Sequence, residues 1–105
     1  MPHRITITQE AKAQLQDLPA REQRIISEGI AARLQDQPTV PSKAIKLLRP
    51  NPLAGYELRL GDLRVLYNVD EENLEVVVAI VGRKAGNSLV VEGREFHGHQ
   101  SDPAE

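Results

Sequence analysis

Cysteine is absent from the sequence, and aromatic residues are nearly so, with only Tyr56, Tyr67 and Phe96. Without cysteine the chain can form no disulfide framework, thiolate zinc site, iron–sulfur cluster or cysteine nucleophile. So few aromatic rings argue against a base-stacking platform for nucleic acid. The formal net charge of −2 and the pI of about 5.9 also argue against nucleic-acid binding, because nucleic-acid-binding domains are usually basic.

Long apolar runs are also missing, since none approaches the roughly 20 residues that span a bilayer. The first residues, MPHRITITQE, lack the apolar segment of a signal peptide. We therefore expect a cytoplasmic protein without membrane contact. A length of 105 residues fits one domain over 1–105, because a chain this short has room for a single core. The polar end, 92–105, is expected to be a partly ordered tail.

The first part of the chain predicts a strand followed by a helical hairpin. Apolar and polar residues alternate over 4–8, which is the period of a half-buried strand. Apolar residues at helical spacing predict one helix over 9–18, with Thr8 as its N-cap, and a second helix over about 20–37. Prolines end the second helix, and 42–48 is expected to be a connector that includes at most a short helical turn.

The second part of the chain predicts an antiparallel meander of strands. Gly61-Asp62 is a two-residue turn signal, and the polar run 70–73 marks another turn. The expected fold class is α+β in the order β-α-α-β-β-β, with the N-terminal strand and the helical hairpin packed on one face of a small antiparallel sheet. The expected meander strands span 56–60, 63–69 and 74–81, and the segment 88–92 could add an extra edge strand.

Pairing across these turns separates the sheet into two chemically different faces. A two-residue hairpin places Arg59 opposite Arg64, and a turn over 70–73 places Arg64 opposite Ala79. Directly opposed residues share a face. One face is then continuously apolar and is expected to pack against the helices; it carries Tyr56, Leu58, Leu60, Leu63, Val65, Tyr67, Val69, Leu74, Val76, Val78 and Ile80.

The opposite face carries opposed arginines. Arg59 and Arg64 lie there beside Glu57, Arg83 has the same parity, and the net charge between residues 43 and 64 is +3. Directly opposed like charges destabilise a sheet, and arginine has a planar donor fork that suits phosphate. The pattern therefore indicates an oxyanion site, with an ordinary exposed face neutralised by Glu57 as the alternative. The residues expected to bind phosphate are Arg59, Arg64, Arg83, Lys46 and Arg49.

The segment 56–84 resembles the RelE/ParE superfamily of toxins from bacterial type II toxin–antitoxin modules. Its sequence, YELRLGDLRVLYNVDEENLEVVVAIVGRK, has their Gly-Asp turn, arginine-bearing strands, acidic turn and apolar strand that ends in Val-Gly and basic residues. The resemblance extends over about 5–84. It implies that a cognate antitoxin holds the protein inactive. RelE-like members are ribosome-dependent mRNA endoribonucleases, whereas ParE-like members share the fold and inhibit DNA gyrase.

The same resemblance implies roles for individual residues. Arg64 and Lys84 stand where RelE has catalytic arginines, and Arg83 precedes Lys84 in the basic pair after Val-Gly. Arg59 stands at a position that is lysine in RelE. Two features depart from RelE: Glu57 replaces another lysine, and a tyrosine farther downstream is not matched. The implied catalytic set is therefore Arg64, Lys84, Arg83 and Arg59.

RNA cleavage of this type also needs a base, because the 2′-hydroxyl attacks the adjacent phosphate. Arginine stabilises the phosphate charge but does not lose its proton at neutral pH. The candidates for the base are Glu57, which is more simply interpreted as a salt-bridge partner, and His97 of the tail, since imidazole titrates in the useful range. No metal or cofactor is expected, because His97 and His99 have no third ligand near them in the sequence.

Three functions are open at this point. The first is a RelE-like endoribonuclease whose partners are the ribosome, mRNA and an antitoxin. The second is a ParE-like gyrase inhibitor without catalysis. The third is a protein with the toxin fold that retains only antitoxin binding.

Overall fold

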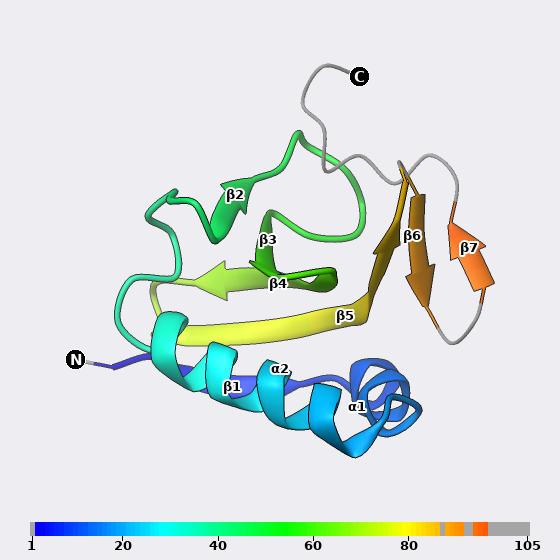
Figure 1. Ribbon diagram of the computed structural model, residues 1–105. Helices are drawn as coiled ribbons and strands as arrows, with labels where there is room; N and C mark the ends of the chain where they lie inside the picture. The colour runs from blue at the N-terminus through cyan, green and yellow to red at the C-terminus, as the bar shows by residue number, and fades with distance from the viewer. Residues whose placement is uncertain (1, 87, 92–93, 97–105) are drawn as a thin grey trace.

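The computed structural model describes residues 2–86, 88–91 and 94–96, and it places two helices beside one sheet (Figure 1). Helix α1 (Gln9–Gln16) begins at Thr8, whose hydroxyl accepts a hydrogen bond from the amide of Ala11. Helix α2 (Ala20–Arg33) follows directly after Pro19. Both predicted helices are confirmed, although both end earlier than expected. Neither described helix is long and apolar enough to span a membrane.

The strands of the described residues form one mixed sheet. Its order is β2-β3-β4-β5-β6-β7, and β1 pairs in parallel with β5. The predicted antiparallel meander corresponds to β3, β4 and β5 and is confirmed. The strands are β1 (Arg4–Ile7), β2 (Ile45–Leu47), β3 (Tyr56–Leu60), β4 (Leu63–Asp70), β5 (Glu75–Ala85), β6 (Ser88–Val91) and β7 (Arg94–Phe96).

Strand β5 is the long central strand of the sheet. Strand β4 pairs with one of its edges, and β1 and β6 share the other edge, β1 beside the start of β5 and β6 beside its end. Figure 1 shows β5 running the length of the sheet before it turns upward beside β6. The end of β5, which carries Arg83 and Lys84, therefore pairs with β6, whereas the first residues of β5 pair with β1.

The connector between α2 and β3 corrects one prediction. The sequence predicted at most a helical turn over 42–48, but β2 pairs antiparallel with β3, with Ile45 opposite Leu58. Burial is the physical reason, because Ile45 is 5% exposed and joins the main core. The strand forms the edge of the sheet.

The β3–β4 hairpin has the predicted register, with Arg59 opposite Arg64. Gly61 supports its tight turn with a φ of 63°, a conformation that glycine adopts without steric cost. The predicted β4–β5 register is wrong. The turn lies one residue later than expected, so Asp70 pairs with Glu75, and the pairing shifts again between Leu66 and Tyr67.

This second shift is a β-bulge at Ala79. Leu66 pairs with Ile80 and Tyr67 with Val78, which leaves Ala79 without a partner in β4. An extra residue exchanges the faces of every side chain that follows it. The later turn and the bulge together place Gly82, and not Ala79, opposite Arg64.

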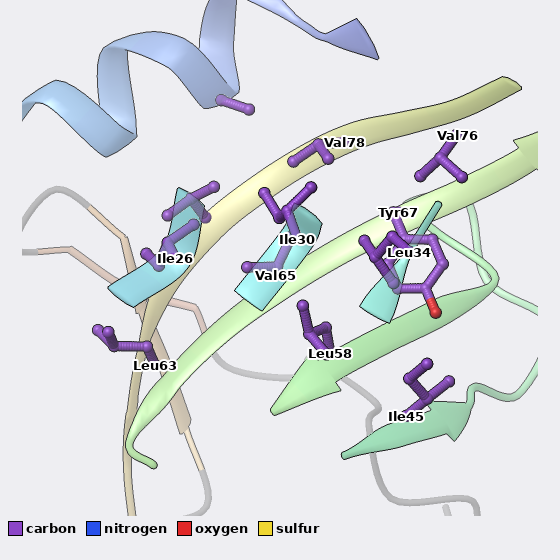
Figure 2. Close-up of a cluster of buried hydrophobic side chains, with 12 residues drawn as sticks. Ile26, Ile30, Leu34, Ile45, Leu58, Leu63, Val65, Tyr67, Val76 and Val78 are labelled. Carbon is purple, nitrogen blue, oxygen red and sulfur yellow. The ribbon is translucent and has the colours of Figure 1, made fainter. Parts of the chain in front are cut away.

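The main core lies between the helices and the predicted apolar face (Figure 2). Ile26, Ile30 and Leu34 of α2 lie over the sheet residues of this cluster in the view. Ile26 is fully buried, and a side chain of this size contributes about 1.5–3 kcal/mol when it is removed from water. The apolar face is confirmed with two exceptions: the bulge brings Val81 into the main core in place of Ile80, and Leu74 lies in the turn before β5.

A smaller apolar cluster covers part of the opposite face. Ile80, which was expected on the helix face, packs there instead, because it follows the bulge. The loop between β2 and β3 and the strand β6 both contribute side chains to this cluster. The sheet face opposite the helices is therefore exposed to solvent over only part of its area. The cluster consists of Leu48, Ala54, Leu66 and Leu89, with Ile80 packed against it.

Candidate functional site

The register of the sheet gathers basic residues on the face opposite the helices. Lys46 of β2 pairs with Glu57 of β3, and Arg59 pairs with Arg64 of β4. Arg64 pairs in turn with Gly82, so Lys84, two residues farther along β5, has the same parity. We call these four basic residues, Lys46, Arg59, Arg64 and Lys84, the cationic face.

Glu57 lies on this face opposite Lys46 of β2, and it is almost completely buried, with 1% of its surface exposed. Its Oε1 atom accepts a hydrogen bond from Nε of Arg59 at 3.1 Å. The side chain of Arg59 is 37% exposed, so it reaches solvent while Glu57 fixes its inner end. The interpretation of Glu57 as a salt-bridge partner is confirmed, and its carboxylate acts here as a buried counter-charge.

Arg64 is held more firmly than Arg59. It is 8% exposed, and its Nη1 atom donates hydrogen bonds to the carbonyl oxygens of Gly61 at 2.6 Å and Leu63 at 2.8 Å. Burial lowers the pKa of Arg64, and Arg59 lowers it further, while Glu57 and Asp62 oppose the change. The guanidinium stays charged, because arginine does not deprotonate in proteins. Arg64 therefore provides a fixed positive charge below the exposed end of Arg59.

Arg83 does not lie on this face, which corrects the expectation from its parity. The β4–β5 register places it opposite Leu63 on the helix side of the sheet. There its Nη1 and Nη2 atoms bond to the two carboxylate oxygens of Glu22 in α2, at 2.9 and 2.5 Å. The hydrogen bonds that Arg83 donates to Glu22 raise the pKa of Arg83, and they lower the pKa of Glu22. The physical reason is the bulge at Ala79, which exchanges the faces of the residues after it.

Lys84 is exposed, and it takes the place on the cationic face that the sequence had given to Arg83. Its backbone amide donates to the carbonyl of Asp62 at 2.8 Å, which ties it to the β3–β4 turn. Lys46 is half-buried beside Glu57. Arg49 is exposed in the loop after β2, where its carbonyl accepts from the side chain of Asn51.

His97 and His99 lie outside the described residues. Within the described ranges, no three histidine, aspartate or glutamate side chains gather as a metal site would require. Glu22 was not singled out from the sequence, because neither helical spacing nor strand parity connects it with Arg83; only the bulge does.

Comparisons with known proteins identify a family and several solved structures that this chain resembles. The family described as ParE toxin of type II toxin–antitoxin system, parDE, matches residues 5–85. The chain belongs to this toxin family. The predicted membership of the RelE/ParE superfamily is therefore confirmed. A comparison with curated protein sequences found no significant match.

Solved structures support the same conclusion. The RelBE2 toxin–antitoxin complex of Mycobacterium tuberculosis contains a chain with 27% identity and a TM-score of 0.70, and the match covers 80% of this chain and 100% of that one. The archaeal RelE–RelB complex of Pyrococcus horikoshii gives 26% identity and a TM-score of 0.66, with 83% and 99% covered. The isolated E. coli RelE toxin, at 22% identity, has a TM-score of 0.64 with 79% and 85% covered, and it shows the shared fold.

Proposed function

We propose that this toxin is a RelE-like endoribonuclease that cleaves mRNA on the ribosome and is held inactive by a cognate antitoxin. The observation that supports it best is the cationic face, to which four neighbouring strands each contribute one basic side chain and on which Arg59 is paired with the buried carboxylate of Glu57. The toxin–antitoxin family to which the chain belongs supports the antitoxin partner. Two of the similar structures are themselves toxin–antitoxin complexes.

The chemistry of the proposed reaction gives each basic residue a role. Attack by a 2′-hydroxyl on the adjacent phosphate crowds negative charge on the phosphate oxygens in the transition state. The exposed end of Arg59 and the ammonium of Lys84 bind these oxygens, and the buried Arg64 adds fixed positive charge behind them. Lys46 and Arg49 contact neighbouring phosphates. Lys84 is also the proposed proton donor for the leaving 5′-oxygen.

The proton acceptor is the remaining role in this proposal. Glu57 is engaged with Arg59 and almost completely buried, which favours a supporting role over direct contact with RNA. His97 is therefore the proposed base, since imidazole titrates near neutral pH. With three aromatic residues in the chain, phosphate contacts must supply most of the RNA binding, and the ribosome presents the substrate.

Expression in cells without an antitoxin tests this proposal. The wild-type chain should arrest growth and leave cleaved transcripts, and Arg59→Ala should relieve the arrest. Arg24→Ala is the matched control, because Arg24 is an exposed arginine on α2, far from the proposed chemistry. Growth arrest that persists unchanged in Arg59→Ala would contradict the proposed role of the cationic face.

One observation favours a second candidate, the ParE-like inhibition of DNA gyrase without catalysis. Glu57 and Arg64 are both engaged within the protein, which suits a binding surface as well as an active site. The two functions differ in a cell-free translation reaction. The nuclease leaves a cleaved reporter mRNA, whereas the gyrase inhibitor leaves the mRNA intact and impairs supercoiling by purified gyrase.

A further inference from the structure

The end of β5 decides which basic side chain faces the proposed RNA site. Arg83 is the last residue of β5 that pairs with β4, where it lies opposite Leu63. Lys84 lies beyond that point. It is held by the hydrogen bond that its backbone N–H donates to the carbonyl of Asp62 and by pairing with Leu89 of β6. Neighbouring side chains on a strand point to opposite faces, so the side that Arg83 takes also determines the side that Lys84 takes.

Arg83 is fixed on the helix side by a two-point contact. Its guanidinium bonds to both carboxylate oxygens of Glu22, and a paired fork of this kind restrains the orientation of both groups. Glu22 lies in the first turn of α2, and its side chain is 19% exposed. The ion pair therefore connects the helical layer to the strand end that carries Lys84.

The ion pair also opposes a specific alternative register. If the bulge at Ala79 were lost, the strand end would exchange its faces. Arg83 would then leave Glu22 and join the cationic face, while Lys84 would turn toward the helices. The Glu22–Arg83 pair stabilises the observed arrangement, because only the bulged register brings these two side chains together.

We infer that Glu22 is a positioning residue: through Arg83 it holds Lys84 toward the same anion that Arg59 binds. The inference rests on the proposed function, because it assigns Lys84 and not Arg83 to the phosphate. Glu22 itself contacts neither RNA nor the reacting atoms. Its loss should leave ribosome binding in place while it misplaces the ammonium of Lys84, and a misplacement of about 1 Å can reduce a rate up to a hundredfold.

The first test measures cleavage of ribosome-bound mRNA by Glu22→Gln, with Glu28→Gln as the matched control, because Glu28 is an exposed carboxylate on the same helix. We expect kcat to fall about tenfold or more with KM unchanged in Glu22→Gln, and no change in the control. The double variant Glu22→Arg with Arg83→Glu restores the ion pair in reverse and should recover most of the activity. Cleavage by Glu22→Gln at the wild-type rate would overturn the inference.

A second test does not depend on cleavage. The ammonium resonance of Lys84, assigned with Lys84→Arg, is followed by NMR as inorganic phosphate is added. We expect phosphate to shift this resonance in the wild type and to shift it less in Glu22→Gln, with thermal unfolding confirming that the variant is folded. If phosphate shifts the resonance but ribosome-bound mRNA stays intact, the proposed function fails and the positioning role stands. If phosphate leaves Lys84 unshifted in the wild type, or shifts it equally in both proteins, the positioning role fails.

Discussion

His3 should make the stability of this toxin depend on pH. Its side chain is buried, with Nδ1 at 3.1 Å from the carbonyl oxygen of Gln35 and Nε2 at 3.0 Å from Oε1 of Glu71. Both partners are hydrogen-bond acceptors. A neutral imidazole has one N–H group and an imidazolium has two, so only the protonated ring satisfies both contacts. The hydrogen bond to Glu71 is the largest cause that raises the pKa of His3, the Gln35 carbonyl adds to it, and burial opposes it.

The direction of the effect follows from this raised pKa. The stabilisation from His3 is fully present below its ordinary pKa of 6.5, and it is lost as the pH rises through the higher pKa of the folded state. Deprotonation removes one of the two hydrogen bonds, and a bond of this kind contributes about 1 kcal/mol. In a domain of this size, that loss lowers Tm by roughly 4 °C.

Thermal unfolding followed by circular dichroism measures this effect, at about pH 6, below the ordinary pKa of 6.5, and at about pH 8. The wild type should lose more stability between the two values than His3→Gln does. A control with His97→Gln and His99→Gln removes the other two histidines, and it should keep the wild-type dependence. The reasoning is refuted if His3→Gln and the wild type show the same change in Tm.

Three further substitutions test the packing and the buried ion pair by urea unfolding. Tyr67→Phe removes the hydroxyl that donates to the Pro38 carbonyl at 2.6 Å, and it should cost about 1–2 kcal/mol because a buried acceptor loses its partner; no loss would contradict this. Ile26→Ala empties a fully buried position and should cost about 3 kcal/mol, and a loss below about 1 kcal/mol would show that the core closes around the gap. Glu57→Gln removes the counter-charge of Arg59 and should lower the free energy of unfolding by about 2 kcal/mol. This is less than the loss on breaking a fully buried ion pair, because Arg59 reaches solvent. A gain in stability would contradict the role of Glu57 as a counter-charge.

Local signals explain why the β3–β4 hairpin could be predicted. A two-residue turn fixes the register of both strands, so Gly61-Asp62 alone determines that Arg59 opposes Arg64. The apolar alternation that follows identifies the face that packs against the helices. These features are local in the sequence, and the structure confirms them.

The bulge at Ala79 could not be predicted, and it changes the composition of the site. A single extra residue exchanges the faces of everything after it, and no glycine or proline marks the position in 74–81. The position of Arg83 and its pairing with Glu22 both depend on it. Strand β2 was missed for a different reason, because three residues are too few to show a period.

The proposed function is tested most directly with purified ribosomes that carry a defined mRNA, with cleavage mapped by primer extension. We expect the wild-type toxin to cut the mRNA only when ribosomes are present. Lys84→Ala should cut at least about tenfold more slowly, and Lys12→Ala, which replaces an exposed lysine on α1, should cut like the wild type. An mRNA that stays intact with excess toxin would contradict the proposed nuclease activity, and a Lys84→Ala variant as active as the wild type would contradict the proposed role of Lys84.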